Sequence, residues 1–178
     1  MRDIITLPGI GGSGEAHWQS RWEASDSRLR RFSPSNWDQP DLEDWIAALD
    51  RAVAQSKAEP VLVAHSLSCL LVAHWVRRSK HRARGALLVA PPDPSSPAFP
   101  SEAAGFANPP ASALPFASLV IASSDDPFGS LNHARTTANG WGSEFMDIGA
   151  RGHINGTSGL GEWPQGRAAL AALEARLR

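Results

Sequence analysis

The chain has 178 residues, of which 42% are hydrophobic and 20% charged, and its formal net charge is −1. This composition predicts one globular domain, residues 1–178, and gives no reason to expect nucleic acid or an anionic membrane as a partner. The single cysteine, Cys69, excludes an internal disulfide, and no apolar run could span a bilayer or serve as a signal peptide, so we expect a cytoplasmic protein.

Short apolar runs alternate with segments of helical periodicity. The runs that we predict to be strands are residues 4–7, 29–32, 61–64, 86–90, 119–122 and 145–148. Predicted helices cover residues 15–25, 41–55 and 67–76, and a closing helix carries Leu170, Leu173 and Leu177. Continuous apolar strands separated by helices indicate an α/β fold, with a mostly parallel sheet and helices on both faces.

Residues 91–115 interrupt this alternation and hold eight of the 14 prolines. We expect a long loop without regular structure here. It leaves the carboxyl end of the predicted strand 86–90, where the functional loops of a parallel sheet gather. The segment is therefore either a cover over the site or a tolerated surface insertion, and its composition favours neither.

Three residues of the types used in nucleophilic catalysis each come just past the end of a predicted strand. They are Ser66, Asp126 and His153. A serine hydroxyl needs a base to accept its proton and a third group to orient that base. The order Ser, Asp, His along the chain is that of the α/β-hydrolases. We therefore predict Ser66 as the nucleophile, His153 as the base and Asp126 as the orienting acid.

Each of these residues also has a purely structural interpretation. Residues 64–68 read Ala-His-Ser-Leu-Ser and lack both glycines of the usual Gly-x-Ser-x-Gly nucleophile turn. A serine between a strand and a helix commonly caps the helix, Asp126 could form a turn with its neighbours, and His153 could be a solvated loop residue. His65 is expected to pack or to form a local hydrogen bond rather than to act as the base.

The glycine-rich residues 9–14, Gly-Ile-Gly-Gly-Ser-Gly, are predicted to supply part of an oxyanion hole. Acyl transfer develops negative charge on an oxygen, which needs preorganised N–H donors. We expect the backbone N–H of Leu67, directly after the nucleophile, to be one donor. The second is predicted to be the N–H of Ile10, with Gly11 as the alternative, because small residues let the backbone approach a substrate.

The same glycines also match the Gly-x-Gly-x-x-Gly fingerprint of dinucleotide-binding proteins. That motif requires an acidic residue about 20 positions further on. Residues 28–34 contain none, although Arg30 and Arg31 could meet a 2′-phosphate. Metal-ligand spacing is absent from the remaining histidines, His17, His74, His81 and His133. We therefore predict neither a cofactor nor a metal.

Four segments carry a family pattern in combination. They are the stretch from Leu7 through His-Trp-Gln at 17–19, Ala-His-Ser-Leu at 64–67, Ser-Ser-Asp-Asp-Pro-Phe at 123–128, and the run from Gly-His-Ile-Asn at 152–155 to Trp-Pro at 163–164. Together they resemble the small serine hydrolases of the YdeN and retinoblastoma-binding-protein type. The resemblance covers essentially the whole chain and implies a compact α/β-hydrolase fold without a large helical cap. It places the family's triad on Ser66, Asp126 and His153.

The chain departs from the family pattern at Ser68, where the family usually has glycine or alanine. A serine adds only a hydroxyl, which one turn into a helix can donate back to the carbonyl of Ala64. We predict that Ser68 is accommodated in this way with Ser66 active.

These observations predict a serine hydrolase of carboxylesterase-like type, EC 3.1.1. It would cleave a carboxylic ester, thioester or amide of a small molecule through an acyl-enzyme. The alternative is a non-catalytic binding or regulatory protein on the same scaffold, because a fold does not fix a function.

Overall fold

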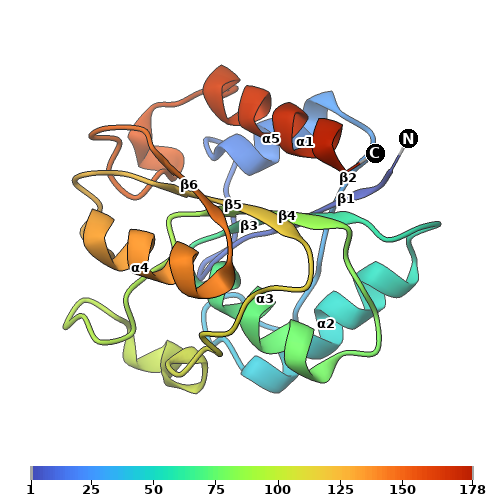
Figure 1. The fold of residues 1–178 in the computed structure, drawn as a ribbon, viewed down its shortest axis with the longest axis horizontal. Helices are drawn as coiled ribbons and strands as arrows, with labels where there is room; N and C mark the ends of the chain where they lie inside the picture. Colours follow the sequence, from blue (N-terminus) through green and yellow to red (C-terminus); the bar gives the residue numbers. More distant parts are fainter. Residues whose placement is uncertain (1, 178) are drawn as a thin grey trace.

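A central sheet of six parallel strands organises the molecule, whose residues 2–177 are described by a computed structural model (Figure 1). The strand order is β2-β1-β3-β4-β5-β6. The strands are β1 (Ile4–Leu7), β2 (Leu29–Arg31), β3 (Val61–His65), β4 (Gly85–Val89), β5 (Ala117–Ala122) and β6 (Glu144–Asp147). All six predicted strands are present, with small shifts at their ends, and the predicted fold class is confirmed.

Helices cover both faces of the sheet (Figure 1). On one face lie α1 (Trp18–Ser25) and α5 (Pro164–Arg176), and on the other lie α2 (Leu42–Ala54), α3 (Leu67–Arg78) and α4 (Leu131–Trp141). Residues 131–141 lie outside the helices predicted from the sequence, so α4 is an additional helix. Within residues 2–177, no helix is both long enough and apolar enough to cross a membrane.

The two helical layers explain why the strands read as continuous apolar runs. Leu62 and Ala64 of β3 belong to the core beneath α2, α3 and α4, whereas Val61 and Val63 belong to the core beneath α1 and α5. All four side chains are at most 1% exposed. A strand buried on both faces needs apolar residues at every position, and this is the pattern of a parallel sheet in an α/β protein.

Side-chain caps set the beginnings of the first two helices. Asp41 accepts a hydrogen bond from the N–H of Asp44 and caps α2, as its place in the sequence predicts. Helix α1 begins later than predicted because His17 caps it. The Nδ1 atom of His17 accepts the N–H of Gln19 at 3.1 Å. This cap fixes the His17 ring at the edge of the sheet where the strands end.

The proline-rich residues 91–115, which we call the strap, are more regular than expected. They contain a 3₁₀ helix, η1 (Ser101–Phe106), whose Phe106 is fully buried and packs on Trp45. Further along, the indole N–H of Trp141 donates to the carbonyl of Pro110 at 3.0 Å. The expectation of a structureless loop is therefore wrong, because apolar residues between the prolines anchor the strap in the core.

Candidate active site

Ser66 occupies a sharp turn between β3 and α3. Its φ is 55° and its ψ is −124°, a backbone conformation that non-glycine residues rarely adopt. The side chain makes no capping hydrogen bond to the helix, so the cap interpretation does not describe it. A Cβ placed on Gly9 would lie 3.0 Å from the Cβ of Ser66, which shows how closely the segment after β1 passes the serine. Strained turns of this kind cluster at functional sites.

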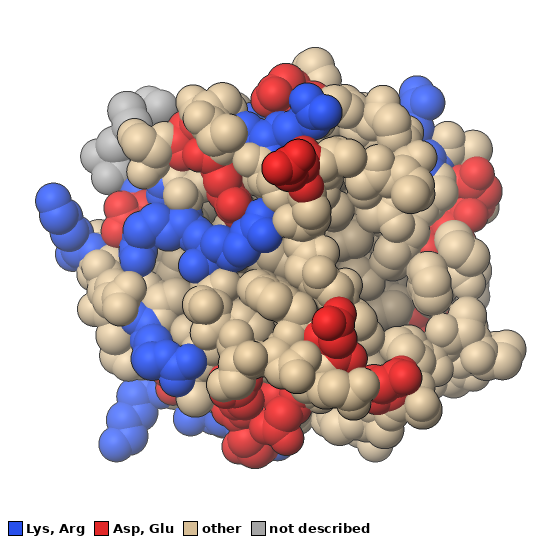
Figure 2. Space-filling model, turned by 180° about the vertical axis from the view of Figure 1, so that it is seen from behind, with Lys and Arg blue, Asp and Glu red and all other residues tan. Residues whose placement is uncertain are grey.

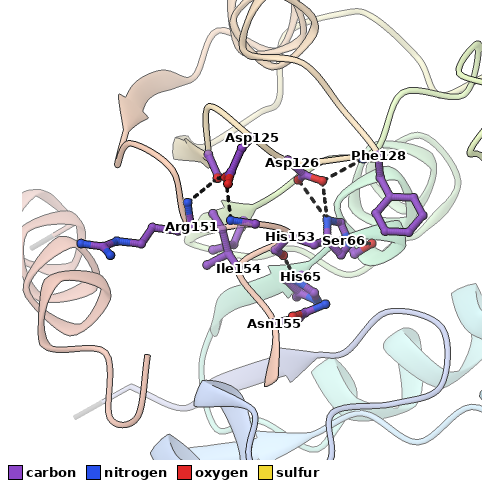
Figure 3. A network of polar contacts seen from close by, with 12 residues as sticks. His65, Ser66, Asp125, Asp126, Phe128, Arg151, His153, Ile154 and Asn155 are labelled. Carbon is purple, nitrogen blue, oxygen red and sulfur yellow. Dashed lines mark hydrogen bonds and ion pairs between the residues drawn. The ribbon is translucent and has the colours of Figure 1, made fainter. Parts of the chain in front are cut away.

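The structure brings the three predicted residues into one hydrogen-bonded series (Figure 3). The Nε2 atom of His153 lies 2.7 Å from the Oγ of Ser66, and its Nδ1 lies 2.9 Å from each carboxylate oxygen of Asp126. The Asp126 side chain is only 2% exposed, and its Oδ1 also accepts the N–H of Phe128 at 2.9 Å. The candidate nucleophile, base and orienting group thus stand at the distances that proton transfer from a serine requires.

Asp125 joins the loop of Asp126 to the loop of His153. The Oδ1 atom of Asp125, a residue labelled in Figure 3, accepts the hydroxyl of Ser123 at 2.8 Å and the N–H of Gly152 at 2.7 Å. These hydrogen bonds, that of Ser123 first, lower the pKa of the Asp125 carboxyl below its usual range. Asp125 therefore does more than shape the turn before Pro127, because its contacts hold two loops in register.

His65 touches the main chain of His153. Its Nε2 lies 2.9 Å from the carbonyl oxygen of His153, and a carbonyl can only accept, so Nε2 carries the proton and donates. The His65 ring centroid is 5.0 Å from that of His153 and 4.7 Å from that of His17. Burial lowers the pKa of His65 well below its usual value, which keeps the ring neutral. The prediction that His65 packs rather than acts as the base agrees with this geometry.

The two predicted oxyanion donors border the space in front of Ser66. Leu67 is the first residue of α3, and an N–H at this position has no partner within the helix. The N–H of Gly11 instead donates to the carbonyl of Trp37 at 3.0 Å, so it is already engaged. This leaves Ile10 as the candidate for the second donor, and both Ile10 and Leu67 line the cavity at the site.

Ser68 has a different partner from the one predicted. Its Oγ donates to the carbonyl of Pro8 at 2.6 Å, and the residue is fully buried. The Sγ of Cys69, not the Oγ of Ser68, is within hydrogen-bonding distance of the carbonyl of Ala64, at 3.8 Å. The expected bond within the helix is therefore wrong. The first turn of α3 lies against the end of β1, and the hydroxyl satisfies a carbonyl there.

A cavity of about 510 Å³ opens beside Ser66. Three of its lining residues, Pro92, Phe99 and Pro100, belong to the strap, so the strap borders the site. No lysine, arginine, aspartate or glutamate of the described chain is among the residues that line it. The cavity has the size of a typical small-molecule site, and its wall is predominantly apolar.

The two arginines that could bind the phosphate of a dinucleotide are engaged by other groups of the protein. Arg31 is engaged by Glu23 and by the carbonyl of Ser13, and Arg30 is engaged by Asp3 and by neighbouring polar groups. The glycine-rich segment borders the cavity at Ser66 rather than a nucleotide cleft. Across residues 2–177 there is no group of three or more metal-ligating side chains that could hold an ion.

Comparisons with known proteins agree with this fold. Residues 4–172 match the model of the serine hydrolase family. A protein described as a YdeN-like hydrolase from Pectobacterium atrosepticum is 32% identical, with a TM-score of 0.88, and the match covers 98% of this chain and 91% of that one. The ydeN gene product of B. subtilis is 21% identical, with a TM-score of 0.78 and a coverage of 98% and 100%.

A third solved structure, an esterase from Thermogutta terrifontis, is 16% identical, with a TM-score of 0.67 and a coverage of 97% and 89%, and at this identity it shows the fold alone. A search of the curated proteins gives no match. The family model spans nearly the whole chain, and the Pectobacterium protein exceeds 30% identity over most of both chains. The chain therefore belongs to the serine hydrolase family and resembles its YdeN-like members.

Proposed function

We propose that this serine hydrolase cleaves a carboxylic ester of a small molecule through an acyl-enzyme, with Ser66 as nucleophile, His153 as general base and Asp126 as its orienting acid. The observation that carries the proposal is the continuous series of short contacts from the Asp126 carboxylate through both ring nitrogens of His153 to the Ser66 hydroxyl. The same chemistry serves thioesters and amides, and matched acyl donors of the three kinds would rank them.

In the first half of the reaction, Nε2 of His153 accepts the proton of the Ser66 hydroxyl as Oγ attacks the ester carbonyl carbon. The carbonyl oxygen takes the negative charge, and the backbone N–H groups of Leu67 and Ile10 stabilise it. The bond to the alcohol oxygen then breaks, and His153 returns its proton to that oxygen. In the second half, water takes the place of the alcohol, and the acid product and free Ser66 are formed.

Asp126 orients the imidazole ring of His153 so that Nε2 can accept the proton of Ser66 and later return it. Both of its carboxylate oxygens are 2.9 Å from Nδ1 of His153, so the proton of the neutral ring stays on Nδ1 and the lone pair of Nε2 faces the serine. When His153 becomes positively charged, the adjacent carboxylate stabilises that charge. An asparagine at this position would favour the wrong tautomer.

The test compares Ser66→Ala, Asp126→Asn and a control, Ser124→Ala, at an exposed serine near the acid. Ester hydrolysis should fall by at least about 10³-fold in the first two variants and stay at the wild-type level in the control. A fluorophosphonate probe should label the wild type and the control but not Ser66→Ala. Unchanged hydrolysis by Ser66→Ala would overturn the proposal. Absence of both labelling and hydrolysis in the wild type would favour a binding or regulatory protein.

A further inference from the structure

The cavity beside Ser66 is lined by two unlike groups of residues. β3, which delivers Ser66, lies between β1 and β4. The segments after β4 and β5 contribute the apolar Pro92, Phe99 and Phe128 to one side. The segment after β1 and the residues after His153 contribute small or polar groups to the other, among them Ala16, His17 and Thr157.

Contacts within each side hold it together. The strap is joined to the loop of Asp126 because the N–H of Asp93 donates to the carbonyl of Phe128 at 2.8 Å. On the opposite side, a Cβ placed on Gly156 would lie 3.6 Å from the Cβ of Ala16, so the short helix η2 (Gly156–Ser158) packs on the segment after β1.

The chemistry assigns one part of an ester to each side. In the proposed reaction, His153 gives its proton to the departing alcohol, so the alcohol must lie near the ring. Residues 155–157, two to four positions after His153 in the chain, line the polar side. The acyl group then extends to the other side, toward the strap, where Pro92 and Phe99 offer apolar surface.

No group on this wall could balance a charge on the substrate. Among residues 2–177, no lysine, arginine, aspartate or glutamate lines the cavity, and the carboxylate of Asp126 is engaged by His153. Figure 2 shows Lys and Arg side chains gathered toward the left of the face in view, where the strands begin, and few on the right, where they end. A charged acyl group would lose its hydration without gaining a partner.

The wall formed by the strap is fixed rather than hinged. Phe106 is fully buried, and its carbonyl lies 3.2 Å from Nε2 of His74 on α3. Two further hydrogen bonds hold the strap. The indole N–H of Trp141 donates to the carbonyl of Pro110, and the N–H of Asp93 donates to the carbonyl of Phe128 in the loop of Asp126. Phe99 is carried by a segment that is attached on both sides of it, so the depth of the acyl side is set by the fold.

We propose that the natural substrate is an ester of an uncharged, apolar acyl group, and that Phe99 limits the length of that group. The proposal rests on the proposed hydrolase function and adds the substrate class and the residue that selects it. The alcohol part lies on the side of His17 and Thr157. Esters whose acyl group bears a carboxylate or an ammonium are poor substrates.

The test measures kcat/KM for 4-nitrophenyl esters of acetate, butyrate and octanoate, together with the hemisuccinate as the charged counterpart of butyrate. The wild type should prefer butyrate to hemisuccinate by at least about 100-fold. Phe99→Ala should raise the ratio of octanoate to butyrate by about tenfold, because a pocket discriminates methylene groups at this scale. Phe145→Ala, a phenylalanine of β6 outside the cavity, and Thr157→Val, on the other side, should leave the ratio unchanged.

Equal turnover of hemisuccinate and butyrate would overturn the substrate class. If Thr157→Val changed the octanoate-to-butyrate ratio of kcat/KM as much as Phe99→Ala does, the assignment of the acyl side would be overturned. Fluorophosphonate labelling separates this proposal from the hydrolase function. If the wild type is labelled at Ser66 but prefers the charged ester, the hydrolase function stands and the proposed substrate class is wrong. If the wild type neither reacts with the probe nor hydrolyses any ester, both proposals are wrong.

Discussion

The Nε2 atom of His65 lies 2.9 Å from the carbonyl oxygen of His153, so the residue before the proposed nucleophile holds the main chain of the proposed base. The two proposed catalytic groups, Ser66 and His153, are 87 residues apart in the chain. This single hydrogen bond ties the second segment to the end of β3, where the first is placed. His65 is thereby a candidate for a positioning residue, which acts on the reaction through His153.

Replacing His65 by phenylalanine should lower kcat 10- to 100-fold with little change in KM, because a small displacement of a catalytic group has a large effect on rate. His65→Gln should remain within a few-fold of the wild type, since its amide N–H reaches a similar position and donates to the same carbonyl. Steady-state kinetics with a neutral ester measure both effects. Equal losses in the two variants, or a loss confined to KM, would contradict a positioning role.

Ser68 should act on the oxyanion hole through Pro8. Its hydroxyl donates to the Pro8 carbonyl at 2.6 Å, two residues before Ile10, and the N–H of Gly11 is fixed by Trp37 on the far side. We expect Ser68→Ala to lower kcat about tenfold, less than the 10²–10³-fold loss of a direct donor. The KM should stay constant.

A trifluoromethyl ketone inhibitor provides the decisive readout, since it forms a tetrahedral oxyanion on the serine. Its affinity for Ser68→Ala should fall in parallel with kcat, and the pH dependence of kcat/KM should keep the wild-type form. Ser68→Gly should behave in the same way. If either variant were more active than the wild type, the serine would be an impairment of the turn and not a support of the loop.

Acid should destabilise the protein through His17. Burial, with Arg31 as a smaller contribution, lowers the pKa of His17 from 6.5 to about 4. The unfolded chain therefore binds a proton near pH 6.5 that the folded chain does not bind until about pH 4. The free energy of unfolding therefore holds the full contribution of His17 above pH 6.5. As the pH falls from 6.5 toward 4, this contribution is lost, and the free energy of unfolding decreases by about 3 kcal/mol. The buried His65 acts in the same direction.

Urea unfolding at pH 7 and pH 4.5 measures this loss. His17→Asn keeps an acceptor for the cap of α1 but removes the titrating ring, so its free energy of unfolding should depend less on pH than that of the wild type. His81→Asn, at an exposed histidine, should keep the wild-type dependence. The same loss in wild type and His17→Asn would show that His17 is not its source.

The strands β1, β3, β4 and β5 were predictable because they are buried on both faces and hence largely apolar. The edge strands β2 and β6 are only partly buried, and their sequences give a weaker signal. Helix α4 was missed because small residues form most of its buried face. Its buried residues, Ala134, Ala138 and Trp141, do follow a helical spacing, and Ser130 caps it by accepting the N–H of His133. That spacing and cap would have sufficed to predict the helix. The 3₁₀ helix in the strap had no comparable signal among its prolines.

The positions that meet at the site were predictable from chain order, because the carboxyl ends of parallel strands share one edge of the sheet. The contacts that support them were not. A rule of local hydrogen bonding assigned Ser68 to Ala64, yet its partner is Pro8, 60 residues away in sequence. The partner of His65 is likewise separated from it by 88 residues. Such contacts depend on how strand ends and loops stack, and no local pattern encodes this.

The anchoring of the strap also has a consequence for how this enzyme could be altered. Phe106 and Trp141 lie outside the cavity wall, yet the first is part of the strap and the second binds it through Pro110. A substitution at either position would shift Phe99 without touching substrate. Changes of acyl preference, in laboratory evolution or between related proteins, should therefore accumulate at these distant anchors as readily as at the wall itself.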